Sequence, residues 1–454
     1  MIRFIMRLVT LAFPVLVAFG AVAQDSQELT LERAVAIALE KNPLRKAALA
    51  DQKIASAATN EARSMLLPKL MFSEAAMRGN DPVYVFGTRL RQQSFTPADF
   101  ALHRLNTPTP IGNFTSRFSG QWSVFDAMQS WYSVSRAKLA QTAAGQQLDR
   151  TDQQLIFNVV RAYYGVTLAE RQVETADLAV NTARAIEEHS RSRVTSGVTV
   201  SSDLLSAQVL AAQRQQEAIR ARNGLALART QFAIALGMSS AAEFSTATEL
   251  REQALPLAGI NELESAALTN RPDLKRLLTE ESAQDVSVKM AKAAFAPRVS
   301  VFGSWQTDSR SLGWNGGNNW TAGAELQFDL FSGGSKVARL QREKATQERI
   351  AALRDNAKDQ IRLEVRSSYF DLDAARQQVE VARAAVEQAN ESLRITQNRY
   401  ESGLTTVTDL MRVEDAARRT RTDYWDALYR MHTSYAALEL ATGTLSPNSQ
   451  VVKQ

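Results

Sequence analysis

The apolar positions between Ser335 and Ser402 follow a heptad spacing, with steps that alternate between four and three residues. Ten of the twelve positions in this series are apolar or aromatic. The series consists of Ile361, Val365, Ser368, Leu372, Ala375, Val379, Ala382, Val386, Ala389, Leu393, Thr396 and Tyr400. Because the inner part of this stretch contains neither Gly nor Pro, it predicts one helix over about 335–400, roughly 100 Å long and packed in a coiled coil.

The same series recurs 206 residues earlier in the chain and predicts a second long helix over about 130–194. Its members are Leu155, Val159, Ala162, Val166, Ala169, Val173, Ala176, Val180, Ala183, Glu187, Ser190 and Val194. Each long helix is followed by the same motif, SGVTVSSD at 196–203 and SGLTTVTD at 402–409. We expect tip loops at 195–203 and 401–409 that lead into return helices over about 203–236 and 409–441.

The duplication extends over the whole chain after its first residues. At a shift of 229, Pro43 in KNPLRK matches Pro272 in NRPDLK, and Pro68 in LLPKL matches Pro297 in FAPRV. We therefore divide the chain into a first repeat at 24–236, a connector at 237–260, a second repeat at 261–441 and a tail at 442–454. The shift falls from 229 to 206, so the first repeat carries 23 extra residues between about 75 and 113.

Four segments show an alternation of period two instead of a helical period. They are residues 69–80, 113–126, 297–308 and 319–331, each about ten residues long with aromatic residues near the ends. In the last segment, Trp320, Ala322, Ala324, Leu326, Phe328 and Leu330 share one face. This length and pattern are typical of transmembrane β-strands. The alternative is a soluble hairpin with one buried face.

Four strands are too few to close a barrel by themselves. An open sheet edge in hydrocarbon leaves backbone groups without hydrogen bonds, at several kcal/mol each. Two copies of the chain would give eight strands, whose interior side chains fill, whereas three copies would give twelve and leave a lumen. The polar faces of the strands, with Arg117, Gln121, Glu325 and Gln327, favour a water-filled lumen. We expect an oligomeric tunnel.

Composition adds an export signal and excludes several classes of site. Residues 1–23 have a basic start at Arg3 and Arg7, an apolar run and a small-x-small site before Gln24, which predicts a signal peptide. The chain has no Cys, so it cannot carry a disulfide, a thiolate metal site or a lipidated N-terminal Cys. The net charge of +5, about +3 without the signal peptide, gives no indication of nucleic-acid binding.

With these features in order and duplicated, the chain resembles the TolC family of outer-membrane efflux proteins over essentially its whole mature length. The start LERAVAIALEKNP, the two x-Pro entries into strands and the SG…DL loops carry the resemblance, and NDPVYVFGTRLRQQSF is similar to a segment of one branch. The resemblance implies a mainly α fold with membrane β-structure: a homotrimer with a 12-stranded barrel on a long periplasmic α-helical barrel. It also implies an outer-membrane exit duct for an inner-membrane pump with a periplasmic adaptor, or for type I secretion.

The resemblance assigns roles to the tip loops, which close the tunnel and dock the adaptor. The implied gating positions are Asp203, Asp409, Tyr400 and Arg412, and the implied turn and docking positions are Ser196, Gly197, Val198, Ser402, Gly403, Leu404 and Thr405. Thr405 and Arg412 depart from the residue types of the family's latch and selectivity ring, so Arg412 and Asp409 are expected to pair instead. We hypothesise that Asp203 and Asp409 line the constriction; the structural alternative is that both are helix N-caps. Gly197 and Gly403 are expected to adopt a positive φ.

No catalytic chemistry is visible in the sequence. The three histidines, His103, His189 and His432, are scattered, and we expect His103 simply to be exposed. The segment SRAK at 135–138 fits S-x-x-K but has no companion motif, and FSGGSK lacks the spacing of a phosphate loop. We therefore expect no enzyme activity, cofactor or metal. The competing hypotheses are an exported coiled-coil spacer without a transport role and a periplasmic adaptor, and the sequence does not specify the cargo.

Overall fold

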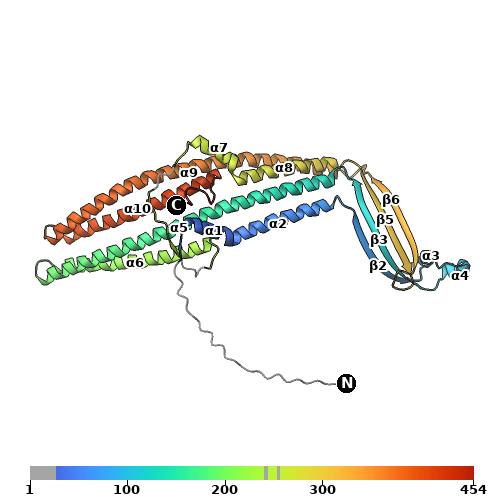
Figure 1. Cartoon of the computed structure of the whole chain (residues 1–454), viewed down its shortest axis with the longest axis horizontal. Helices are drawn as coiled ribbons and strands as arrows, with labels where there is room; N and C mark the ends of the chain where they lie inside the picture. Colours follow the sequence, from blue (N-terminus) through green and yellow to red (C-terminus); the bar gives the residue numbers. More distant parts are fainter. Residues whose placement is uncertain (1–26, 240–243, 253–255, 454) are drawn as a thin grey trace, which may run out of the picture.

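The computed structural model describes residues 27–239, 244–252 and 256–453 of the chain. Figure 1 shows an elongated molecule in which two helical hairpins run to one end and a β-sheet lies toward the other. The predicted signal peptide, residues 1–23, lies outside the described residues. None of the described helices combines the length and apolar character needed to cross a membrane.

The two long helices are α5 (Gln129–Thr195) and α9 (Ser335–Glu401), each of 67 residues. They turn back into α6 (Ser201–Ala235) and α10 (Val407–Thr442). All twelve heptad positions in each long helix are buried or partly buried, so the series marks the packed seams. The observed ends of these four helices lie within two residues of those expected.

Each repeat opens with a helix pair broken at Pro. The pairs are α1 (Leu31–Lys41) with α2 (Pro43–Ser64), and α7 (Ile260–Asn270) with α8 (Pro272–Ala293). Pro at the first helical position cannot continue the preceding helix, because it lacks the amide that the helix needs. At the first break, the Asn42 side chain accepts a hydrogen bond from the Leu44 amide at 2.9 Å and donates to the Ala235 carbonyl at 3.0 Å. The break is therefore fixed against the end of α6.

The sheet contains β2 (Lys69–Gly79), β3 (Ile111–Phe125), β5 (Arg298–Ser309) and β6 (Gly317–Gln327). All neighbours pair antiparallel in the order β2-β3-β5-β6. Strand β6 ends four residues earlier than expected, so Phe328 and Leu330 lie outside it. The reason is that Gln327 pairs with Arg298, the first residue of β5, so no partner strand continues beyond it. The edge strands β2 and β6 are left open for pairing with other copies.

The largest hydrophobic core lies midway along the long helices and not at their tips. There residues of α1, α5, α6, α9 and α10 form one cluster with a small parallel sheet of β1 (Gln27–Leu29) and β4 (Phe244–Thr246). Tyr163 is fully buried; its hydroxyl donates to the Leu29 carbonyl at 2.8 Å and accepts from the Thr248 amide at 2.9 Å. Val451 and Val452 of the tail are also fully buried in this core. The described parts of the connector and the tail thus brace the middle of the helices.

The extra residues of the first repeat are folded instead of forming a simple loop. They contain α3 (Pro82–Arg91), a 3₁₀ turn (Pro97–Phe100) and α4 (Leu102–Asn106). Figure 1 shows α3 and α4 beyond the end of the sheet that lies farthest from the helical tips. His103, on α4, is exposed as expected.

Candidate functional site at the helical tips

The two tip loops have the same backbone structure. Gly197 and Gly403 have φ values of +70° and +73°, which confirms the expected positive φ. In the first loop the Gly197 amide donates to the Val194 carbonyl at 3.0 Å, and the Val198 amide donates to the Arg193 carbonyl at 2.9 Å. The second loop repeats both bonds at 3.0 and 2.8 Å. This is a Schellman C-cap, and it explains why the SG motif occurs twice.

Both loops present an apolar side chain to solvent directly after the glycine. Val198 is 64% exposed and Leu404 is 69% exposed. A Schellman cap usually packs this residue against its own helix, so the exposure leaves an apolar contact unused. The Ser196 and Ser402 hydroxyls, in contrast, donate to carbonyls four residues back, each at 2.9 Å. The serines therefore complete the turns, while Val198 and Leu404 face outward.

Asp203 and Asp409 lie in the first turns of α6 and α10, and the alternative that they are the N-caps is wrong. The N-cap positions are Val200 and Thr406, because the helices begin two residues earlier than expected. The Thr406 hydroxyl donates to the Asp409 carboxylate at 2.7 Å, and the Thr199 hydroxyl donates to Asp203. A carboxylate in the first turn is favoured by the helix dipole. Each loop therefore fixes one carboxylate at its return helix.

The surroundings of Asp409 combine two threonine hydroxyls with one arginine. The hydrogen bond from Thr406 is the main reason that its pKa is lowered, and Thr405 and Arg412 lower it further. An Arg412 Nη2 atom lies 3.8 Å from an Asp409 carboxylate oxygen, and both side chains are exposed. The structure thus forms the expected Arg412–Asp409 pair. Among the described residues, no hydrogen bond or ion pair joins Asp203 to Asp409.

Tyr400 is buried between the hairpins, and only 5% of it is exposed. Its hydroxyl lies 2.9 Å from the hydroxyl of the fully buried Ser190 on α5. The Arg193 guanidinium donates to the Tyr400 carbonyl at 3.0 Å and lies over the Tyr400 ring, 5.4 Å from its centroid. Tyr400 therefore joins the end of α9 to the end of α5.

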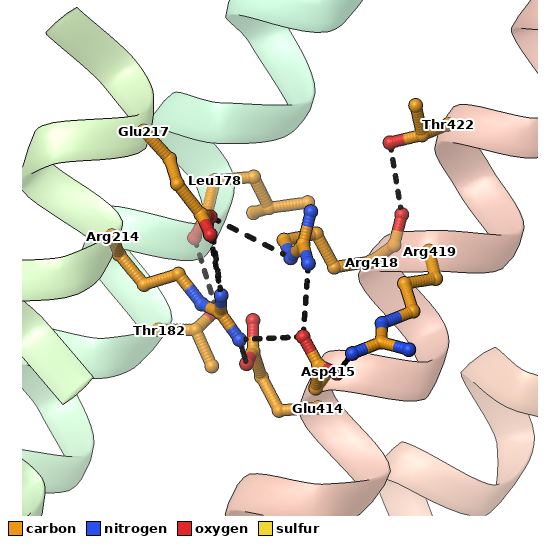
Figure 2. A network of polar contacts seen from close by, with 9 residues as sticks. All are labelled: Leu178, Thr182, Arg214, Glu217, Glu414, Asp415, Arg418, Arg419 and Thr422. Atoms are coloured by element: carbon orange, nitrogen blue, oxygen red, sulfur yellow. Dashed lines mark hydrogen bonds and ion pairs between the residues drawn. The ribbon is translucent and has the colours of Figure 1, made fainter. Parts of the chain in front are cut away.

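A buried ionic network joins the hairpins farther from the tips. Figure 2 shows Arg214 of α6 reaching across to two acidic residues of α10. Its Nη2 atom lies 2.7 Å from Glu414 and 3.1 Å from Asp415, and its Nη1 atom lies 3.1 Å from Glu217. The side chains of Arg214 and Glu414 are only 5% and 3% exposed. Burial alone would lower the pKa of Arg214, but its bond to Glu414 and the acidic charges raise it, so the guanidinium stays charged.

Two further arginines balance the charges of this network. Arg418 lies 2.9 Å from Asp415, and Arg419 lies 2.7 Å from the same carboxylate. Three arginines therefore face three carboxylates (Figure 2). Such balance is needed because a buried charge without a partner costs several kcal/mol.

The sequence interpretation missed Arg214 and Glu414, although their spacing carried a signal. Arg214 follows the buried Ala207 and Leu210 at core spacing on α6. Glu414 follows the buried Leu410 by four residues on α10, as Arg214 follows Leu210 on α6. A charged residue of opposite sign at a core position in each of two helices predicts a buried pair that sets their register.

The described residues contain no group of three or more His, Asp or Glu side chains placed to hold a metal ion.

The chain matches the outer membrane efflux protein family over residues 34–238 and 263–444, one segment for each repeat and most of the chain in total. The chain belongs to the outer membrane efflux protein family. Members of this family are trimeric outer-membrane channels that work with a periplasmic adaptor and an inner-membrane pump. The expected duct function and localisation are confirmed, and the spacer and adaptor alternatives are set aside.

Individual relatives agree with this assignment to the outer membrane efflux protein family. The chain is 24% identical over 440 residues to the alkaline protease secretion protein AprF of Pseudomonas aeruginosa, covering 94% of this chain and 88% of AprF. It is 24% identical over 336 residues to the outer membrane protein TolC of Vibrio cholerae, covering 70% of this chain and 74% of TolC. In fold it is similar to the Campylobacter jejuni CmeC outer membrane channel, with a TM-score of 0.79 at 17% identity, covering 99% of this chain and 96% of CmeC.

Proposed function

We propose that the tips form the periplasmic gate of this exit duct, with Asp203 and Asp409 lining the constriction. The observation that carries the proposal is that two separate sets of contacts hold the hairpins together, one at the tips and one farther from them. One is the Ser190–Tyr400 contact at 2.9 Å, and the other is the Arg214 network. Opening then requires the α9–α10 hairpin to separate from the α5–α6 hairpin.

Conductance in planar bilayers tests the two carboxylates. Asp203→Asn and Asp409→Asn each preserve side-chain shape and remove one negative charge per subunit. Because fixed negative charge attracts cations into a narrow passage, we expect both variants to lower cation selectivity, with the double variant lowest. Asp51→Asn, on the exposed surface of α2, is the matched control. Unchanged selectivity in the double variant would remove both residues from the constriction.

We further propose that Val198 and Leu404 dock the periplasmic adaptor. These side chains are the apolar contacts left unused by the tip turns, at 64% and 69% exposure. Replacing both with Ser leaves the Schellman hydrogen bonds intact, because they are made by the backbone. We expect weaker capture of the adaptor with normal trimers. Capture equal to wild type would place the docking surface elsewhere.

The duct is proposed to be passive, with the pump supplying both energy and selection and the duct carrying out no catalysis. The relatives include an alkaline protease secretion protein, so an extended polypeptide is one candidate cargo, and small solutes are the other. A deletion strain separates them: loss of a secreted protein indicates secretion, whereas increased sensitivity to drugs or metals indicates efflux.

A further inference from the structure

The 31 residues between β2 and β3 form a small folded unit, residues 80–110, which we call the outer cap. Asp99 lies at its centre and is 5% exposed. Its carboxylate accepts hydrogen bonds from the Thr96 amide and hydroxyl, both at 2.8 Å. Arg89 and Arg104 approach it at 3.2 and 3.7 Å. These bonds tie the 3₁₀ turn to α3 and α4, so the cap has a defined structure.

An aromatic cluster supports the same unit. The Phe95 ring packs edge-on against Phe86 and Phe100, with centroid distances of 4.9 and 5.2 Å. The equivalent connection in the second repeat, between β5 and β6, is only residues 310–316. The repeats thus differ most at this end of the molecule, and only the first can build a cap.

The cap is attached to the sheet by buried side chains. The Gln92 side-chain amide donates to the Gly112 carbonyl at 3.0 Å and to the Asn113 side chain at 2.9 Å. Asn113 in turn donates to Asp308 of β5 at 2.7 Å, and Asp308 is completely buried. Because burial excludes competing water, this chain of polar contacts holds the end of α3 on β3 and β5.

The cap also touches β6. The Asn319 side-chain amide donates to the Arg91 carbonyl at 3.2 Å. At Gly317, a Cβ atom would lie 2.1 Å from the same carbonyl oxygen, so the backbones approach too closely for any side chain. The attachment therefore spans three of the four strands.

All three attachment side chains on the strands belong to the polar face of the sheet. Asn113 and Asp308 lie on the same face as Arg117 and Gln306, which are joined by a 2.9 Å hydrogen bond. In a membrane barrel the polar face points into the lumen. The apolar face carries a different cover, Trp314, whose ring lies 5.5 Å from that of Phe118. The cap is thus held on the lumen side of the barrel's outer rim.

We propose that the outer cap is a fixed constriction at the external mouth of the channel, made by three copies in the trimer. It acts independently of the tips, at the opposite end of the duct. The outlet then passes small solutes and extended chains and excludes folded proteins. This inference rests on the family's trimeric barrel and not on the proposed roles of Asp203 and Asp409.

Labelling of an engineered cysteine from outside the cell tests the proposal, because the chain has no Cys of its own. Thr321→Cys places a thiol on the polar face of β6, inward of Asn319. Intact cells are treated with membrane-impermeant maleimides carrying polyethylene glycols of increasing length. We expect small reagents to label this position and long ones to fail. Replacing residues 80–110 with a loop as short as 310–316 should shift the size limit to longer reagents.

Leu312→Cys is the matched control, since Leu312 is 74% exposed in the short β5–β6 loop, which both proteins contain. It should react with every reagent in both. If the shortened protein forms no heat-modifiable trimers, Gln92→Ala replaces it, because this change removes the buried anchor and leaves the chain length unchanged. The proposal would be overturned if the longest reagent that labels Thr321→Cys were the same in the protein with the intact cap and in the protein whose cap has been removed or released. Failure of the tip proposal would leave this result unaffected, because the reagents do not pass the tips.

Discussion

Removing Arg214 alone should weaken the contact between the hairpins much more than removing both Arg214 and Glu414. In Arg214→Met, Glu414 keeps its charge while only 3% exposed, and it loses the cation 2.7 Å away. In Glu414→Leu, Arg214 keeps Glu217 and Asp415, both at 3.1 Å. The double variant Arg214→Met/Glu414→Leu leaves neither charge. The three variants therefore separate the pair interaction from simple loss of packing.

The structure sets the order of the effects. An uncompensated buried charge costs about 3–5 kcal/mol, so Arg214→Met should lie in that range. Glu414→Leu should cost only about 1–2 kcal/mol, because Arg214 remains paired with Glu217 and Asp415. The double variant should cost less than Arg214→Met, since replacing a whole buried pair with apolar groups is often close to neutral. The double-variant cycle should then give a coupling energy larger than the cost of the Glu414 single variant, about 1–2 kcal/mol.

Hydrogen exchange of amides in α6 and α10 near the network measures local opening of the intact trimer. A loss of about 3 kcal/mol accelerates exchange by roughly 150-fold, since each 1.36 kcal/mol is tenfold. Arg222→Met is the control, because the 2.8 Å pair of Arg222 with Asp177 is exposed and should contribute less than about 1 kcal/mol. If the double variant costs as much as the two single variants together, Arg214 and Glu414 do not act as a pair and the reasoning is refuted.

Three further changes test the tips and the central core. Tyr400→Phe removes the hydroxyl 2.9 Å from buried Ser190 and should cost about 1–2 kcal/mol, measured by exchange at the tips; wild-type protection would contradict this. Gly403→Ala should destabilise the second tip loop by about 1 kcal/mol in the same assay, because the φ of Gly403 is +73° and alanine is strained there. Gly224→Ala is the control, because Gly224 lies inside α6 and its replacement should not destabilise the protein. Burial raises the pKa of Glu439 from 4.5 to about 7. The folded protein therefore binds the proton more tightly than the unfolded chain, and stability should fall by up to about 3 kcal/mol as pH rises through that range. Trimer melting should show this fall, and Glu439→Gln should abolish it.

Periodicity was sufficient to predict the long elements. The heptad series in α5 and α9 depends on side chains that pack every three or four residues, and the alternation in the strands depends on a sheet with one polar face. Both patterns repeat along the element, so an error at one residue does not matter. The SG motif was equally informative, because a helix end with positive φ strongly favours glycine.

Features that depend on a particular partner could not be predicted in this way. Strand β6 ends at Gln327 because its partner begins at Arg298, although the alternation continues to Leu330. Similarly, Asp409 lies inside the first turn because Thr406 caps the helix. The outer cap depends on contacts such as Gln92 with Asn113, which no spacing in the sequence indicates. Arg214 is different, since its charge at a core position was visible and was not used.

The two repeats share a sequence pattern, but their equivalent helices have different neighbours in the subunit. The apolar side chains and strand edges that have no neighbour within the subunit are the surfaces that the trimer can cover. Helix α5 lies between neighbouring helices, whereas α9 forms one outer edge of the helical layer and α6 and α2 together form the other (Figure 1). Large apolar side chains remain exposed at both edges, among them Val209 at 57% on α6, and Phe370 at 59% and Val381 at 71% on α9. The edge strands β2 and β6 leave backbone groups unpaired on the same two sides. A single subunit therefore leaves apolar helix side chains uncovered and strand-edge backbone groups without hydrogen bonds. Because assembly supplies both, the stability of the fold cannot be separated from that of the trimer.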